Sequence, residues 1–429
     1  MLPVIRTCGD PFEIPKFEMA ERDIGEFAEE LRGFHEQFAD CFSRSESRMN
    51  FHRYMSGQFG SFERKSIEPI ALRVEGGDAR VMQHFVSDVV WGEDRMSSKY
   101  RTMVDSDMGD EDGVMIFDET GFPKKGKDSV GVSRQYCGIT GKVDNCQVGV
   151  FTAYASPHGY ALVDKRLFMP ETWFDGDHRR LRKKCKVPKD LRFRTKPQLA
   201  AEMLREARRE KSLRFRYVAC DSVYGQSPDF IATVEEDPKT VYFVAVANTT
   251  LCWTREPVMV EKHYRYKGEV RTKSVLDDGE KKPISVDILA KGINDYFWYR
   301  RTVSEGTKGP IDYDFARNRI VLCKDGAPDR DVWLIIRRSV SEKPEYSYFI
   351  SNAPKNAPLR LFVWLGGLRW PIEQAFEECK TELGMDHYEV RKYPGWNHHI
   401  LTCMLGHFFL WHTKIKLGKK STCAYSVAA

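Results

Sequence analysis

The sequence has no long apolar run and no paired cysteines. Its longest apolar stretch, residues 400–411, is broken by polar residues and is much shorter than the ~20 residues that span a membrane. The N-terminus lacks the basic segment and apolar run of a secretory signal. The eleven cysteines occur singly, which is typical of reduced thiols. These absences predict a cytoplasmic protein that has no membrane partner and needs no disulfides.

A clear zinc motif is also missing. The nearest pattern is Cys403, His407 and His412 on one predicted helix, but these residues lie among Leu, Met, Phe and Trp. Zinc ligands normally form tighter clusters. Core packing is therefore favoured over a metal site.

Charge is distributed unevenly along the 429 residues. Residues 178–216 contain 16 Lys or Arg and four acidic residues, although the whole chain has a net charge of only +5. Such a segment suggests a polyanionic partner, most commonly nucleic acid. The alternative is a solvated helix face with i,i+4 ion pairs. The densest cations, which we take as candidate DNA contacts, are Arg179, Arg180, Arg182, Lys183 and Lys184.

Hydrophobic periodicity predicts a mixed α/β fold. The first ~110 residues have helical spacing, and two helices over 64–72 and 78–90, joined by Gly76-Gly77, could form a helix-turn-helix DNA reader or simply pack together. Short β-type runs follow at 114–117, 148–155, 160–168 and 215–220, with a helix at 197–211. Residues 230–350 are strand-rich, and helical spacing returns after residue 358.

Three carboxylates stand out by position. Asp118 follows the run at 114–117 and Asp221 follows the run at 215–220, so both are expected at strand ends. Two anions above neighbouring strands repel each other unless a cation lies between them. Oxygen ligands favour Mg²⁺ or Mn²⁺, and two such ions can activate an attacking oxygen and stabilise a leaving one.

Glu373 is the third carboxylate. Arg369 lies four residues before it and Lys380 seven after it, so the three share nearly one helix face. An exposed i,i+4 salt bridge would explain the pattern equally well, and Glu377 is a competing ligand one turn further on. Pro371 predicts a helix start or kink near Trp370.

Several motifs together resemble bacterial DDE transposases, most closely the insertion-sequence-701 branch of the insertion-sequence-4-like group. The resemblance covers residues 51–411, and its motifs are FDETGFPKKG (117–126), GVSRQY (131–136), NCQVGV (145–150), FRTKPQLA (193–200), DSVYG (221–225) and RWPIEQAFEECK (369–380).

The resemblance implies an RNase H-like core with a β-rich insertion, preceded by a helical domain. The expected organisation is a helical N-terminal DNA-binding domain at 1–110, the first part of the core at 111–229, a β-rich insertion including a core strand at 230–350, C-terminal core helices at 351–413 and a flexible tail at 414–429.

The resemblance also implies a chemistry. Asp118, Asp221 and Glu373 would hold two Mg²⁺ ions, for which Mn²⁺ may substitute. Water would then hydrolyse the phosphodiester at a transposon end, and the freed 3′-hydroxyl would attack target DNA. The cations expected to neutralise phosphates are Arg369 and Lys380, together with Lys124, Lys125 and Arg134, although a solvated turn would also explain the latter three. The family's Tyr three residues before the Arg is replaced by Gly366, which puts a DNA contact in doubt.

The resemblance further implies double-stranded DNA as partner and a homodimer in the DNA-bound synapse. Trp298, within FWYRR at 297–301, could stack on an extruded base, or could pack in the core. Two other functions stay open, a transposase-derived DNA-binding protein without catalysis and an RNase H-like nuclease without strand transfer.

Overall fold

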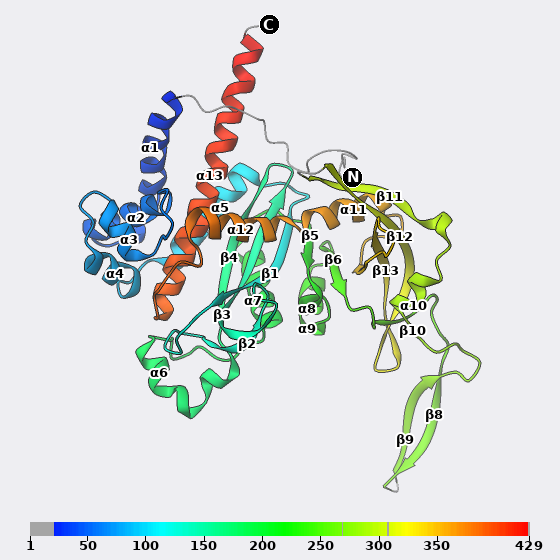
Figure 1. The fold of residues 1–429 in the computed structure, drawn as a ribbon. Helices are drawn as coiled ribbons and strands as arrows, with labels where there is room; N and C mark the ends of the chain where they lie inside the picture. The colour runs from blue at the N-terminus through cyan, green and yellow to red at the C-terminus, as the bar shows by residue number, and fades with distance from the viewer. Residues whose placement is uncertain (1–20, 268, 307–308, 428–429) are drawn as a thin grey trace. The chain divides into compact units, whose positions relative to one another are not determined.

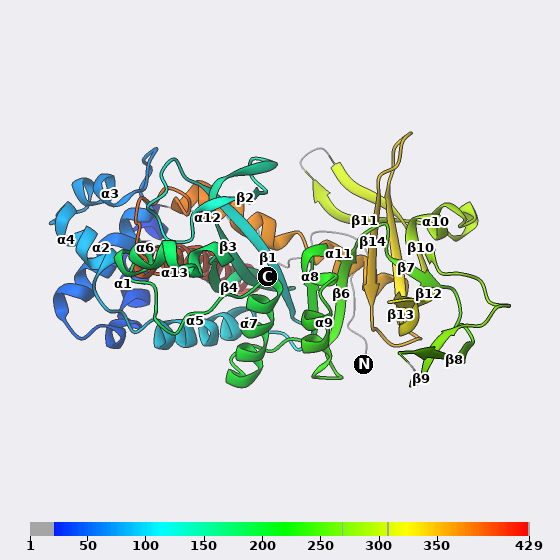
Figure 2. The same ribbon diagram turned by 90° about the horizontal axis from the view of Figure 1, so that it is seen from below.

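The computed structural model describes residues 21–267, 269–306 and 309–427, which divide into two compact units (Figures 1 and 2). Unit 1 comprises Arg216–Arg369, and unit 2 comprises the described residues before 216 and after 369. Helices and strands are mixed along the chain, so the predicted α/β class is confirmed. Residues 1–20 of the predicted N-terminal domain and residues 428–429 of the predicted tail lie outside the described residues.

Unit 2 contains an antiparallel sheet in which β3 is central. β1 pairs along one edge of β3, while β2 and β4 share the other edge. β3 can hold both because it is 15 residues long. The predicted hairpin is confirmed as β3 and β4. The strands are β1 (Val114–Pro123), β2 (Ser133–Cys137), β3 (Lys142–Ser156) and β4 (Gly159–Phe168).

Helices surround this sheet, and the predicted helical N-terminus is confirmed over its described part. The α-helices of unit 2 are α1 (Glu21–Glu36), α2 (Ser45–Gln58), α3 (Ile67–Arg73), α4 (Ala79–Ser87), α5 (Glu93–Met108), α6 (Arg179–Lys184), α7 (Lys196–Glu210), α12 (Pro371–Leu383) and α13 (Tyr393–Val427), with 3₁₀ turns at Ala39–Cys41, Glu171–Phe174 and Gly176–His178. A turn with Gly76 at φ +65° joins α3 to α4, as predicted. Whether this pair reads DNA remains a prediction.

The two faces of the unit 2 sheet are covered by different helices. Successive side chains of a strand point to opposite faces. Lys196 of α7 forms an ion pair with Glu119 of β1, whose side chain lies on the opposite face of the sheet from that of Asp118. Phe376 of α12 packs its ring 5.2 Å from that of Phe151 in β3. Phe151 lies opposite Asp118, so α12 covers the face that carries Asp118.

Unit 1 is built on a second set of strands, numbered β5 (Tyr217–Cys220), β6 (Val241–Val246), β7 (Leu251–Trp253), β8 (Met259–Tyr266), β9 (Glu269–Leu276), β10 (Ile284–Ser285), β11 (Tyr299–Gly306), β12 (Gly309–Lys324), β13 (Ala327–Ser339) and β14 (Tyr346–Ser351). β5 and β6 are parallel, and the order continues through β14, β13, β12, β7 and β10. β11 pairs with β12, whereas β8 and β9 form a separate hairpin. The helices are α8 (Ser222–Gly225), α9 (Pro228–Glu235), α10 (Val286–Lys291) and α11 (Leu359–Leu368), with a 3₁₀ turn at Asp295–Phe297.

The units do not follow the predicted domain boundaries. β6 pairs with β5 on one side and with β14 on the other, so the segments on both sides of residues 229 and 350 belong to one unit. α13 continues from its buried first part to Val427, and the flexibility of the tail stays a prediction. No proline interrupts residues 414–427, and adding residues to an existing helix costs much less than nucleating a new one. Among the described residues, no helix is both long and apolar enough to cross a membrane.

Candidate active site

Asp118 lies in the middle of a strand, not at the predicted strand end. β1 pairs with β3 along its whole length, from Val114 opposite Ala155 to Pro123 opposite Cys146. The prediction ended the strand at Phe117 because Asp118 and Glu119 break the apolar run. The long β3 continues the ladder past that point, and Phe122 is fully buried. The backbone of Asp118 is therefore held on a rigid element.

Thr120 and Phe122 share a face of β1 with Asp118, because side chains alternate along a strand. Lys380 of α12 reaches this face, and its Nζ donates a hydrogen bond to Thr120 Oγ1 at 2.6 Å. The same ammonium lies 5.9 Å from the centroid of the Phe122 ring. Burial lowers the pKa of Lys380 from its ordinary value. This contact fixes α12 against the Asp118 face.

Glu373 lies in the first turn of α12. Pro371 is the first helical residue and Trp370 the N-cap, which confirms the predicted helix start. The Glu373 side chain is exposed. It precedes Lys380 by about two helical turns and Phe376 by about one, so these residues line neighbouring parts of the docked helix. The structure thus brings Asp118 and Glu373 to the same face of the unit 2 sheet.

Asp221 lies at a strand end, as predicted. It directly follows β5 and caps α8, and its Oδ1 accepts hydrogen bonds from the backbone N–H groups of Val223 at 2.9 Å and Tyr224 at 3.4 Å. Asp221 belongs to unit 1, whereas Asp118 and Glu373 belong to unit 2. Within the described part of the chain, no group of three or more His, Cys, Asp or Glu is arranged to hold a metal. A site formed by all three carboxylates is accordingly a proposal.

The cations expected beside the carboxylates have different environments. Lys124 is largely buried, with Nζ 3.1 Å from the Tyr388 carbonyl oxygen and 3.5 Å from the Tyr388 ring centroid. Burial lowers the pKa of Lys124 to about 8. Lys125 and Arg134 are exposed, and Arg369 is half-buried at the end of α11. Lys124 is thus engaged in packing, while Lys125 and Arg134 face solvent.

Gly366 lies inside unit 1. It is buried in α11, and a Cβ built at this position would be 3.7 Å from the Phe243 ring of β6. That distance is an ordinary van der Waals contact, so a longer side chain that extended from this position toward β6 would meet the Phe243 ring. Gly366, which replaces the family's Tyr, therefore allows α11 to pack closely on β6.

The basic segment contains two kinds of cation. Several of those outside α6 form ion pairs, such as Arg194 with Glu202 at 2.7 Å. Those of α6 are mostly exposed, and among the described residues no ion pair involves Arg179, Arg180 or Lys183. Arg182 lies over the Phe174 ring at 5.6 Å, and Lys184 lies 3.5 Å from Asp128. The alternative of internal ion pairs thus holds for part of the segment, while α6 presents positive charge to solvent.

Trp298 packs against a cation, as the alternative of a packing role expects, and its stacking on a base stays a prediction. Trp298 is half-buried, with the Arg338 guanidinium 4.1 Å from its ring centroid. Its neighbours Phe297 and Tyr299 are exposed and line a cavity of about 740 Å³ within unit 1, together with Arg301. Phe297 ends a 3₁₀ turn and Tyr299 begins β11, so Trp298 lies at the junction between these two elements.

The residues of the weak zinc pattern have separate partners. Cys403 accepts a hydrogen bond from Gln58 at 3.1 Å, and His407 binds Glu378 at 2.7 Å. His412 binds Asp107 at 2.5 Å. Each is used in packing α13 against a different element.

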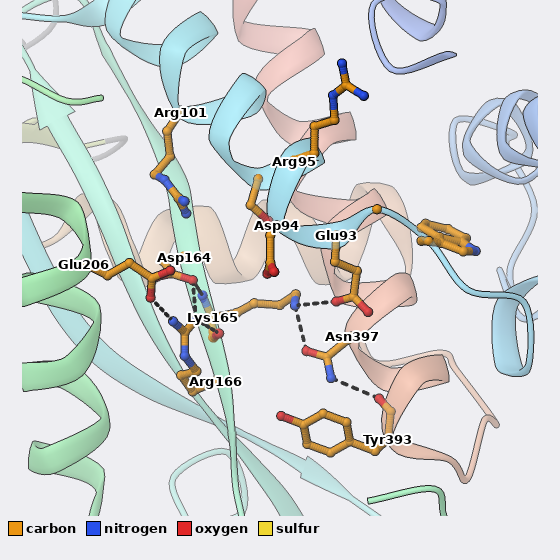
Figure 3. A pocket seen from close by; sticks show the side chains of 13 residues that line it. Glu93, Asp94, Arg95, Arg101, Asp164, Lys165, Arg166, Glu206, Tyr393 and Asn397 are labelled. Atoms are coloured by element: carbon orange, nitrogen blue, oxygen red, sulfur yellow. Dashed lines mark hydrogen bonds and ion pairs between the residues drawn. The ribbon is translucent and has the colours of Figure 1, made fainter. Parts of the chain in front are cut away.

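A charged cavity of about 660 Å³ lies elsewhere in unit 2, between α5, β4, α7 and the start of α13 (Figure 3). Lys165 points into it, with Nζ 3.8 Å from Glu93. Arg166 pairs with Asp164 at 2.6 Å and with Glu206 at 2.5 Å. Since acids and cations of the wall compensate one another, this cavity offers no excess charge to a polyanion. Its network joins the helices to β4.

Two comparisons with known proteins bear on these residues. The sequence profile of the DDE superfamily endonucleases matches residues 37–310, which include Asp118 and Asp221 and end before Glu373. The chain is also similar to a protein of Microchaete diplosiphon described as a probable transposase for insertion sequence element IS701. The two are 23% identical over 343 residues, covering 79% of this chain and 76% of that protein.

Proposed function

The chain belongs to the DDE superfamily of endonucleases, whose core is RNase H-like, and we propose that it is a DNA transposase that cuts transposon ends and joins them to target DNA. The observation that supports this proposal is the hydrogen bond between Lys380 and Thr120, which joins the helix that carries Glu373 to the strand that carries Asp118. Asp221 would complete the site from the end of β5.

Nucleases of the DDE superfamily use divalent metal ions. The proposed donors are three carboxylates, and such hard oxygen ligands fit Mg²⁺, or Mn²⁺ in its place, better than softer metals. We propose that Asp118, Asp221 and Glu373 hold two Mg²⁺ ions. When bound, they would make water or a 3′-hydroxyl a stronger nucleophile and stabilise the departing oxygen.

The chain's own residues would position the DNA. The backbone of β1 fixes Asp118, and Lys380 holds α12 in register through Thr120, so we assign Lys380 to positioning the helix. Lys125, Arg134 and Arg369 would neutralise phosphates near the scissile bond. The exposed cations of α6 would attract the duplex further out.

We also propose that the protein acts as a homodimer that bridges two transposon ends, and that it does so in the cytoplasm. The described cysteines form no disulfide, and most of them are buried, which fits a reducing compartment.

The test uses purified protein and the DNA that flanks its own gene, which carries the element's ends. Asp118→Asn, Asp221→Asn and Glu373→Gln should each abolish Mg²⁺-dependent cleavage while leaving DNA affinity within about threefold, because the carboxylates act on the reaction and supply no attraction to a phosphate. Glu377→Gln is the matched control, since it removes a carboxylate one turn away on the same helix.

Four outcomes would change the assignment. Cleavage that survives in Asp221→Asn would remove Asp221 from the site. Loss in Glu377→Gln with retention in Glu373→Gln would exchange the two glutamates. If the wild-type protein binds the ends and a control transposase cuts its own substrate, but this protein does not cut, it is a DNA-binding protein without catalysis. Cut products without joined ends would indicate a nuclease.

A further inference from the structure

The hairpin of β8 and β9 has almost no packing of its own. The two strands form a separate sheet that pairs with no other strand in the described part of the chain. The described residues from Glu261 to Ser274 are all exposed. Figure 1 shows the hairpin extending away from the other strands of unit 1. An isolated two-stranded hairpin is marginally stable in water, so this element gains little from folding by itself.

The pairing register divides the side chains of the hairpin into two faces. Residues directly opposite each other share a face, and one face carries the pairs Lys262–Lys273, Tyr264–Arg271 and Tyr266–Glu269. We call these six residues the basic face.

The basic face is electrostatically unfavourable without a partner. Lys262 and Lys273 lie directly opposite each other, and like charges in that position destabilise a strand pair. Asp278 lies 3.1 Å from Lys262 and compensates one of these charges. Arg271 lies 4.9 Å from the Tyr266 ring centroid. Over residues 259–276 there are five Lys or Arg and two Glu. Glu269 lies 3.5 Å from Arg271 and compensates a second cation. Among the described residues, Lys273 is the cation of the basic face that forms no ion pair, and an external anion would compensate its charge.

The shape of the hairpin fits duplex DNA. Eight residues per strand give a length of about 27 Å. The major groove is about 12 Å wide and admits a two-stranded β-ribbon. Tyrosine hydroxyls and cations on one face can contact phosphates and base edges simultaneously.

We propose that the β8–β9 hairpin is an arm that binds duplex DNA through its basic face, with the ribbon in the major groove. The identity of the polyanion rests on the proposed function. The arm lies outside the carboxylates and cations already assigned, so it would add affinity and leave the chemical step unchanged.

The test compares two triple variants of the full chain. The arm variant is K262Q/R271Q/K273Q, and the control is K281Q/K282Q/K291Q, which removes the same charge from unit 1 outside the hairpin. All six side chains are exposed, so both proteins should fold, as circular dichroism would verify. Binding to a duplex carrying the element's end is measured by fluorescence anisotropy over a range of salt concentrations.

The arm variant should bind at least about tenfold more weakly than the control at low salt, and its slope of log K against log salt should fall by about 2 to 3, because each phosphate contact contributes about 0.9. Hydrogen exchange of residues 259–276 in the wild-type protein should slow when DNA is added. At saturating DNA, the cleavage rate should be unchanged.

Equal affinity and equal salt slope in the two variants would overturn the arm. So would a change in self-association of the arm variant, measured by ultracentrifugation, without a change in DNA affinity, because the hairpin would then bind a second copy. Failure of the proposed function can be distinguished from failure of the arm. If the wild-type protein never cleaves but the arm variant alone loses affinity, the arm stands and the transposase activity falls.

Discussion

At the scale of single residues, the informative contact is the one between Lys380 and Thr120. The sequence resemblance suggested that Lys380 neutralises a DNA phosphate. In the structure its ammonium is instead largely buried and bound to Thr120 Oγ1 at 2.6 Å. Thr120 is two residues from Asp118, so the bond connects the helix of Glu373 with the strand of Asp118. We therefore assign Lys380 to holding the helix of Glu373 in position.

A double-mutant cycle tests this role. Lys380→Met and Thr120→Val should each lower kcat with little change in DNA affinity, and the double variant should be no worse than the more severe single one. A hydrogen bond to a charged group contributes about 1.5–3 kcal/mol, so a coupling of that order is expected. Thr120→Ser keeps the hydroxyl and should retain activity. If Lys380→Met chiefly raises KM while Thr120→Val is silent, Lys380 contacts DNA directly.

At the scale of elements, the end of α12 depends on one glycine. Gly384 has φ +68° and ends the helix in the left-handed region, which side chains with a Cβ disfavour. A Cβ at this position would lie 2.7 Å from the Lys65 Cβ. The turn at Gly384 also supplies a carbonyl oxygen 3.2 Å from His399 Nε2.

Gly384→Ala should therefore destabilise the protein by about 1–3 kcal/mol, from backbone strain and the forced shift of Lys65. Urea unfolding followed by circular dichroism would measure this free energy. Gly126→Ala is the matched control, because a Cβ there meets nothing within 4 Å and the backbone φ is not positive. Similar midpoints for the two variants would contradict the interpretation of α12's end.

The proposed DNA contacts of unit 2 can be tested within the basic segment itself. R179Q/K183Q removes two exposed cations of α6, whereas R194Q/R209Q removes two cations that the structure pairs with Glu202 and Glu206. Binding to a DNA duplex at several salt concentrations should show a slope of log K lower by about 2 for the first variant and nearly unchanged for the second. An equal decrease in slope for the two variants would show that Arg194 and Arg209 leave their glutamates and contact DNA phosphates.

At the scale of the whole molecule, a buried histidine makes stability depend on pH. His399 of α13 is fully buried, and its Nδ1 lies 2.7 Å from the Tyr54 hydroxyl of α2. Its Nε2 faces the carbonyl oxygens of Gly384 and Met385, so the neutral ring can donate there and accept from Tyr54. Burial lowers the pKa of His399 from 6.5 to about 3.

The unfolded chain therefore binds a proton at His399 between about pH 6.5 and pH 3, and the folded chain does not. The free energy of unfolding should fall as pH decreases through this window, by up to about 1.4 kcal/mol per pH unit from this group, and should be unaffected by it above pH 7. Urea unfolding at pH 7.5, 6 and 5 would measure the slope. His399→Gln should be less stable but should show a smaller slope, and an unchanged slope would assign the effect to other groups.

The position of Asp221 could be predicted from the sequence and that of Asp118 could not, for a physical reason. Asp221 follows a short buried run and caps the next helix, and both signals are local, so its position at a strand end was correct. Asp118 was misplaced because the extension of β1 past Phe117 depends on pairing with Cys146–Phe151 of β3, which lies about 30 residues away. The start of α12 at Pro371 was again a local signal, and it was predicted correctly.

The sequence by itself determined the α/β class, the family and the helical N-terminus, because periodicity, turn residues and motif order are written in neighbouring positions. Only the tertiary structure decided which cations form ion pairs and that Lys380 donates a hydrogen bond to Thr120. It also decided that Phe297 lines a cavity that Trp298 does not line, and that β8 and β9 form a separate sheet. Those outcomes depend on contacts between residues far apart in the chain, whose energies no local pattern specifies.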